Sequence, residues 1–108
     1  MRTAELIGDA LDWAVAICEG VSLEEGLTDD EKCSTDWAQG GPIIERELIA
    51  IEYAVMIDGE SLWTARSKKT AEPRGALGQT PLVAAMRCYI RSKLGDEVKV
   101  PEQYNGGS

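Results

Sequence analysis

The stretch "IAIEYAVMIDGESLWTARS", residues 49–67, decides the fold of this chain. Apolar side chains recur at alternate positions on both sides of Asp58-Gly59, which is a favoured two-residue hairpin turn. The pattern predicts a β-hairpin whose first strand begins near Leu48, while residues 43–48 could still continue a preceding helix. A two-stranded hairpin is only marginally stable in water, so other elements have to cover it.

Two segments on either side of the hairpin have the spacing of amphipathic helices. Residues 3–18 carry an apolar stripe, with Thr3 as the expected N-cap. Residues 80–94 form the clearer pattern, because Thr80 can cap the helix and Pro81 suits the first helical position. The apolar face of this second helix is expected to consist of Leu82, Val83, Met86, Tyr89, Ile90 and Leu94.

The connecting segments are predicted to be irregular. Residues 21–34 are acidic, residues 33–42 contain a Gly-Gly-Pro sequence, and residues 68–78 have the composition of a long mobile loop. The predicted class is therefore α+β, a small single domain in which two helices pack on a β-hairpin or small antiparallel sheet. This domain would span residues 1–100, and a flexible tail would follow over residues 101–108.

We also expect the domain to be completed by oligomerisation. The hairpin would have exposed edges, and Trp13 lies off the apolar stripe of the first helix, where a neighbouring element or subunit could cover it. Domains near 100 residues commonly gain buried area by self-association. The predicted assembly is a homo-oligomer.

Composition narrows the setting and the chemistry. The chain has 108 residues, 44% of them hydrophobic, which fits one domain. It has no apolar run of the roughly 20 residues needed to cross a bilayer and no recognisable signal or transit peptide, so we expect a cytosolic protein without membrane contact. It has no histidine and three cysteines without CxxC spacing. We therefore expect no metal site, no cofactor, and reduced, inert thiols.

Charge is distributed unevenly along the chain. Residues 1–60 contain 15 acids and 3 bases, a net charge of −12, whereas residues 61–108 contain 8 bases and 4 acids, a net charge of +4. The overall charge of −8 argues against direct nucleic-acid binding, because phosphates would be repelled. Two alternatives follow: a local basic pocket for a small anion, or an acidic surface that imitates nucleic acid. Most single charges would simply be solvated.

The stretch "CSTDWAQGGPIIERE", residues 33–47, is the candidate ligand site. Trp37 could stack a flat ring, its polar neighbours could bond the edges of that ring, and the amides of Gly40-Gly41 could cradle an anion. Basic and hydroxyl side chains from other segments would hold the charged end. The predicted ligand-binding residues are Thr35, Asp36, Trp37, Gln39, Gly40, Gly41, Arg66, Thr80 and Arg87.

These residues also have purely structural explanations. Trp37 could be a core or interface anchor, and the Gly-Gly-Pro sequence could be a simple turn. Arg46 and Arg87 could be surface or salt-bridge residues. The observation that favours a pocket is the convergence of an aromatic, polar side chains and two glycines within a few positions.

Several motifs resemble one known family. "STDWAQGGPIIERE" (residues 34–47), "LWTAR" (62–66) and "GQTPLVAAMRCYIRSKLGDEV" (78–98), in this order, look like the NinX-type proteins of tailed bacteriophages, and "ALDWAVAICEG" (10–20) resembles their opening helix. The resemblance covers roughly residues 9–98. It implies a phage origin and expression in the cytoplasm of a bacterial host, and it implies no settled biochemical activity.

Three kinds of function remain open. The favoured hypothesis is a phage-encoded, non-enzymatic protein that sequesters a small anionic nucleotide-type ligand of host antiviral defence, such as a cyclic nucleotide or an ADP-ribose derivative. The alternative is an acidic interaction protein or nucleic-acid mimic that inhibits a host protein. An enzyme would have to use carboxylates such as Asp36, Glu45 or Glu47, because histidine is absent.

Overall fold

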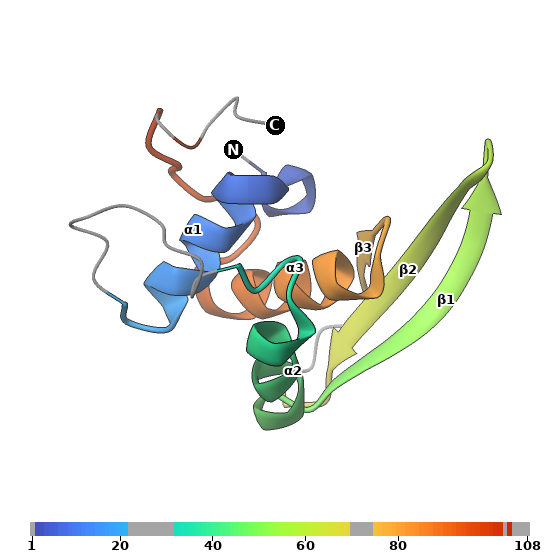
Figure 1. The fold of residues 1–108 in the computed structure, drawn as a ribbon, viewed down its shortest axis with the longest axis horizontal. Coiled ribbons are helices and arrows are strands. Elements are labelled where there is room, and N and C mark those ends of the chain that lie inside the picture. The colour runs from blue at the N-terminus through green and yellow to red at the C-terminus, as the bar shows by residue number, and fades with distance from the viewer. Residues whose placement is uncertain (1, 22–31, 70–74, 103, 105–108) are drawn as a thin grey trace.

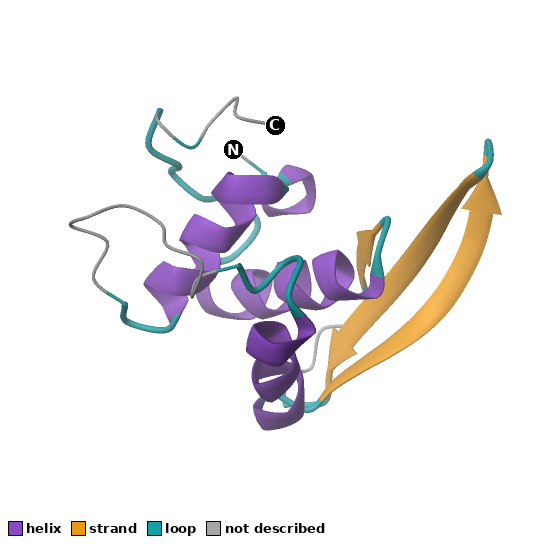
Figure 2. Ribbon diagram, viewed as in Figure 1, coloured by secondary structure: helices purple, strands orange, loops and turns teal. Residues whose placement is uncertain are grey.

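The computed structural model describes residues 2–21, 32–69, 75–102 and 104. Within them the chain forms three α-helices, a short 3-10 helix and a three-stranded antiparallel sheet (Figures 1 and 2). The predicted α+β class is therefore confirmed. Completion of the domain by oligomerisation stays a prediction.

Helix α3, Pro81–Leu94, is the centre of the domain. The hydroxyl of Thr80 accepts a hydrogen bond from the Val83 amide at 3.1 Å, and Gly95 ends the helix with a φ of 86°. Both ends are therefore as the sequence predicts. In the described residues α3 packs against every other named helix and strand. Its buried residues are Leu82, Val83, Ala84, Ala85, Met86, Cys88, Tyr89 and Ile90.

The predicted continuous helix over residues 3–18 is wrong at its beginning. The chain forms the 3-10 helix η1, Thr3–Glu5, and then the helix α1, Gly8–Cys18. Gly8 has a φ of +59°, which lies outside the helical region and separates the two elements. Apolar spacing alone cannot reveal such a break, because both elements bury side chains on the same core.

Thr3 is not the expected N-cap. Its hydroxyl donates to the carbonyl of Gly95 at 2.6 Å, and its amide donates to the carbonyl of Asp96 at 2.8 Å. Thr3 is buried, so these bonds join the start of the chain to the residues that follow α3. The main chain of Arg2 continues this contact through an isolated antiparallel bridge to Glu97.

The stretch predicted as a Trp/Gly-Gly loop is helical. Helix α2, Trp37–Arg46, begins where the Asp36 carboxylate accepts a hydrogen bond from the Ala38 amide at 2.9 Å. Gly40 is buried in this helix, and a Cβ added there would lie 2.6 Å from both the Cys33 carbonyl oxygen and Leu82 Cδ1. The glycine therefore lets α2 approach α3 closely, which local turn propensity cannot show.

The predicted hairpin is confirmed. Strand β1, Ile49–Ile57, pairs antiparallel with β2, Glu60–Ser67. Asp58 and Gly59 both have positive φ, 52° and 81°, as a type I′ turn requires. Strand β1 begins next to Leu48, as the sequence predicts.

A third strand corrects the prediction of a loop over residues 68–78. Strand β3, Ala76–Gly78, pairs with β2, so the strand order is β1-β2-β3. A Cβ at Gly78 would lie 2.5 Å from the Ala84 nitrogen, so glycine is needed for β3 to approach α3. The rest of the predicted loop, residues 70–74, lies outside the described residues.

Part of the predicted flexible tail packs on the domain. Tyr104 is buried, and its ring stacks on Trp13 with the ring centroids 6.3 Å apart. Trp13 therefore covers an element of its own chain, one of the two alternatives that the sequence left open. Residues 103 and 105–108 lie outside the described residues, so flexibility of the tail as a whole stays a prediction.

The two adjacent glycines of α2 provide a matched test of this packing. Gly40→Ala should lower the free energy of unfolding by about 1–3 kcal/mol, because the new methyl group overlaps the Cys33 carbonyl and Leu82. Gly41→Ala should raise it by about 0.5–1 kcal/mol, because nothing lies within 4 Å of a Cβ there and alanine favours helix. Urea unfolding measures both changes. Equal effects of the two substitutions would contradict the packing described for α2.

Candidate functional site

The predicted site residues are distributed over three places in the fold. Six of them, Thr35, Asp36, Trp37, Gln39, Gly40 and Gly41, lie at the beginning of α2 or just before it. Arg66 lies on β2, and Thr80 and Arg87 belong to the cap and the body of α3. The structure therefore does not gather all nine residues around one cavity.

The predicted anion cradle of Gly40-Gly41 is wrong. Neither glycine has a positive φ, and the Gly40 amide donates to the Asp36 carbonyl at 2.9 Å within the first turn of α2. The side chains around it are also engaged with one another. Gln39 donates to the Asp36 carboxylate at 3.2 Å and accepts from the Lys32 amide at 2.7 Å. This polar cluster forms the start of a helix, and a ligand-binding role for it stays a prediction.

Trp37 is not a core anchor of this chain. Its side chain is 55% exposed. A cavity of about 260 Å³ lies between α1 and α2. Gln39 lines this cavity, and Trp37 does not. An exposed indole remains available to a flat ring or to a partner surface, so its predicted stacking role is neither supported nor contradicted.

Thr80 and Arg66 have clear local surroundings. The Thr80 hydroxyl serves as the N-cap of α3. Arg66 borders a cavity of about 270 Å³ on the face of the sheet, together with Glu52 and Lys68. These two residues do not converge with Trp37 or with each other on one described cavity.

Arg87 lines a cavity at the side of α3. This cavity has a volume of about 430 Å³ and lies between η1, β3 and the outward side of α3. Its lining consists of Arg2, Thr3, Ala4, Gly75, Ala76, Leu77, Arg87, Arg91, Asp96 and Glu97. We call it the arginine cavity. Three arginines and two carboxylates give its lining a net charge of +1 in a chain whose overall charge is −8.

The contacts of Arg87 explain why its charge matters. Its Nε donates to the carbonyl of Leu6 and its Nη1 to the carbonyl of Leu77, both at 2.8 Å. Burial lowers the pKa of Arg87, and no carboxylate contributes to that change. Among the described residues this half-buried guanidinium therefore rests on neutral main-chain acceptors, and its positive charge has no anionic partner.

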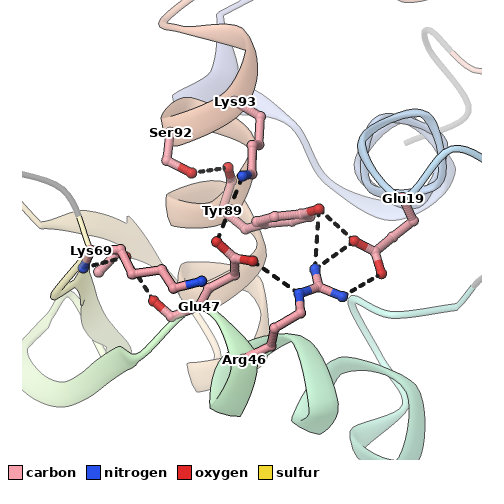
Figure 3. A network of polar contacts seen from close by, with 8 residues as sticks. Glu19, Arg46, Glu47, Lys69, Tyr89, Ser92 and Lys93 are labelled. Carbon is pink, nitrogen blue, oxygen red and sulfur yellow. Dashed lines mark hydrogen bonds and ion pairs between the residues drawn. The ribbon is translucent and has the colours of Figure 1, made fainter.

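Arg46 shows the opposite arrangement (Figure 3). It forms a bidentate pair with the Glu19 carboxylate, at 2.6 and 3.0 Å, and its Nε donates to Glu47 at 2.9 Å. The Tyr89 hydroxyl also donates to Glu19, and the guanidinium lies over the Tyr89 ring at 5.6 Å. Lys93 completes the cluster, 3.8 Å from Glu47. The salt-bridge explanation of Arg46 is therefore confirmed.

This network joins three helices and changes the titration of its members. The hydrogen bond from Arg46 is the main cause that lowers the pKa of Glu19 and of Glu47. Burial is the main cause that raises the pKa of Tyr89. Glu19 follows α1, Arg46 ends α2, and Tyr89 belongs to α3. The cluster therefore acts as a polar clamp on the helices.

The cysteines fit the inert interpretation. Cys88 is buried on α3, and burial raises the pKa of the Cys18 thiol to about 11. A thiol of that pKa is protonated near neutral pH and is a poor nucleophile. Cys33 is half-buried, and its carbonyl packs against Gly40.

Sequence reasoning missed two lining residues of the arginine cavity. Arg91 lies one helical turn after Arg87 on the same basic side of α3, and this spacing could have added it to the predicted site. Arg2 had no comparable signal, because it is brought to the cavity by main-chain and Thr3 contacts with residues 95–97, which are distant in the sequence.

The fold and the cavity define a small α+β domain with a locally basic hollow. A family profile described as bacteriophage P22 NinX matches residues 28–93 of the chain. Because the match covers more than half of the 108 residues, the chain belongs to this bacteriophage family. The motif of residues 10–20 lies outside the matched range. No curated protein matches the chain.

Two further findings concern the described part of the chain. None of its helices is both long enough and apolar enough to cross a membrane. Nor do three or more histidine, cysteine, aspartate or glutamate side chains gather there in an arrangement that could hold a metal ion.

The polar clamp predicts a pH dependence of stability. Because the pKa of Glu19 is lower in the folded state than its ordinary 4.5, its contribution is present above about pH 4.5 and is lost as the pH falls further. Glu19→Gln should lower the free energy of unfolding at neutral pH by about 1–3 kcal/mol and reduce its decline in acid. Urea unfolding at several pH values measures this.

Glu5→Gln, which removes an exposed carboxylate of η1, is the matched control and should leave the profile unchanged. Tyr89→Phe should cost less than Glu19→Gln, because the Arg46 pair remains. An acid decline in Glu19→Gln as steep as in the unmodified protein would contradict the role of this carboxylate.

Proposed function

We propose that this NinX-family chain is a non-enzymatic bacteriophage protein that binds a small anionic nucleotide-type ligand in the arginine cavity. The observation that carries the proposal is the half-buried Arg87, whose charge is met, among the described residues, by the main-chain carbonyls of Leu6 and Leu77. Partial burial of a cation without an anionic partner is unfavourable, and an anionic ligand would supply that partner.

Local charge supports an anion at this place. Arg2 and Arg91 border the same cavity as Arg87, whereas the chain as a whole is acidic. A large polyanion would meet the repulsive outer surface, but a small anion needs only the local field of the cavity. The volume of about 430 Å³ lies within the range of roughly 300–1,000 Å³ that small-molecule sites occupy.

The mixed lining favours a nucleotide over a simple inorganic anion. Guanidinium groups bind phosphate oxygens in a bidentate manner and also stack on flat rings. Asp96 and Glu97 lie in the same lining and could accept hydrogen bonds from ribose hydroxyls or a base amine. Phosphate, hydroxyl and ring occur together in nucleotides, which include the cyclic nucleotides and ADP-ribose derivatives of host defence.

Sequestration is the consequence that suits such a site in a phage protein. A protein that holds a host signalling nucleotide tightly lowers its free concentration by mass action, without any chemical step. Two of the three carboxylates that an enzyme was expected to use have other contacts: Asp36 caps α2, and Glu47 pairs with Arg46. Protection of the phage from host defence, in the host cytoplasm, is therefore part of this proposal.

The acidic-mimic alternative has less support from the described residues. Asp12 accepts a hydrogen bond from the Ser34 amide, and Glu19 and Glu47 belong to the polar clamp, so these three carboxylates serve internal contacts. Five further acids of the acidic half lie within residues 22–31, outside the described residues. This alternative stays open on the charge of the sequence alone.

Calorimetric titration tests the proposal with inorganic phosphate, an adenine mononucleotide, a cyclic dinucleotide and ADP-ribose as probes. We expect at least one nucleotide to bind, and Arg2→Gln and Arg91→Gln each to weaken it by about 10-fold, as loss of one charged hydrogen bond predicts. Arg87 is not the first choice for substitution, because its two main-chain bonds also hold η1 and β3. The ligand recovered from the denatured complex should be chemically unchanged.

Two control variants locate the site. Arg66→Gln and Trp37→Ala should leave binding unaffected, because neither residue lines the arginine cavity. Binding that depends on Trp37 but not on Arg2 would move the site to the start of α2. Absence of heat with every nucleotide, or recovery of a cleaved product, would overturn the proposal of sequestration.

A further inference from the structure

The outer part of the β1–β2 hairpin extends beyond α3 (Figure 1). Four apolar side chains of β1 are exposed there, although apolar side chains normally gain by burial. Their exposed fractions are 48% for Tyr53, 44% for Val55, 59% for Met56 and 51% for Ile57. Successive large apolar residues with such exposure indicate a contact surface.

A β-bulge places these side chains on both faces of the hairpin. Tyr53 pairs with Trp63, and their rings meet edge-on with centroids 5.2 Å apart, so they share one face. The register then shifts, and Val55 pairs with Leu62. Because Leu62 and Trp63 are neighbours in β2, they point to opposite faces, and Val55 therefore lies opposite Tyr53. Neither face of the hairpin end is thus purely polar.

The two edges of the sheet differ in how much unpaired main chain they offer to a further strand. The β3 edge is only three residues long, and the carbonyl of Leu77 on it already accepts a hydrogen bond from Arg87. Strand β1 is nine residues long and forms the other edge. It contains neither lysine nor proline, and Glu52 is its only charged residue. Of the usual devices that prevent an edge strand from pairing, it has the bulge but neither lysine, proline nor a short length.

We propose that a second copy of this chain pairs antiparallel along the β1 edge, with the two-fold axis between Tyr53 and Ala54. The two sheets would then form one continuous six-stranded sheet. The occupant is a second copy because β1 is complementary to itself in this register. The inference is independent of the arginine cavity, whose lining includes no residue of β1.

The bulge is compatible with this register. Residues that face each other across an antiparallel ladder must point to the same face of the sheet. With the axis between Tyr53 and Ala54, Ile51 faces Met56 of the second copy and Glu52 faces its Val55, and each pair shares a face. With the axis on Tyr53 itself, Ile51 would face Val55, and their side chains would point to opposite faces.

Charge allows the same arrangement. Two chains of net charge −8 repel each other at most surfaces. Along β1 the two Glu52 carboxylates would not face each other, because each lies opposite Val55 of the other copy. Apolar side chains from both faces of the hairpin end would be covered at the same time, which an arbitrary acidic or basic partner would not achieve.

The mass in solution tests the proposal. The unmodified full chain should have twice the 11.7 kDa monomer mass by sedimentation equilibrium. Val55→Asp should raise the dissociation constant of the dimer by at least about 10-fold, because the new carboxylate faces Glu52 of the second copy. Val55→Lys should retain the dimer, with an affinity that falls as salt is added, because its ammonium faces the same carboxylate. Ile17→Asp, at a position of α1 that is 42% exposed, is the control and should remain dimeric.

A second measurement needs no substitution. Dilution of the unmodified protein should speed amide hydrogen exchange in residues 49–57 more than in residues 60–67, because only β1 would lose partners. A monomeric unmodified protein would overturn the proposal. The same would follow if Val55→Asp and Val55→Lys had equal effects, or if exchange in β1 did not depend on concentration.

Discussion

Helix α3 buries side chains around most of its circumference, and the arrangement of the other elements follows from the need to cover it. Two of its contacts require glycine. Gly40 brings α2 against Leu82, and Gly78 brings β3 against the main chain of Ala84. A helix of 14 residues is about 21 Å long. It covers the inner part of the hairpin, where Ala65 is buried, and leaves the outer part, around Met56, exposed.

The parts of the fold that sequence predicts are those whose signal is local. Asp58-Gly59 can adopt the positive φ values of its turn without help, and Thr80 with Pro81 defines a helix start within three residues. The Gly40-Gly41 pair led to a wrong prediction of a loop, because glycine disfavours helices. Gly40 is required by the close contact with Leu82, which lies 42 positions later in the chain. The sequence did not predict strand β3, because a strand of three residues is too short to show periodicity.

The candidate site also has one part that the sequence predicts and one part that it does not. Arg87 could be named from its position on the basic side of a recognisable helix, but its partners could not. Its bond to Leu6 joins residues 81 positions apart, and the route by which Arg2 reaches the same cavity depends on a bridge to Glu97. The order of residues within a motif shows which side chains are near in the chain. It does not show which cavity they will share.

Arg46 and Arg87 show why the surroundings of a charge decide its role. In the sequence both arginines had a surface or salt-bridge explanation, and Arg87 was named as a ligand contact as well. Arg46 is neutralised by Glu19 and Glu47, so its charge already stabilises the contact of three helices and has no need of a ligand. Arg87 is positioned by carbonyl dipoles, which fix its geometry but leave its full charge in place. The proposed anion site rests on this difference: an oriented cation beside a cavity, without an anionic partner among the described residues, can bind an anion from outside the chain.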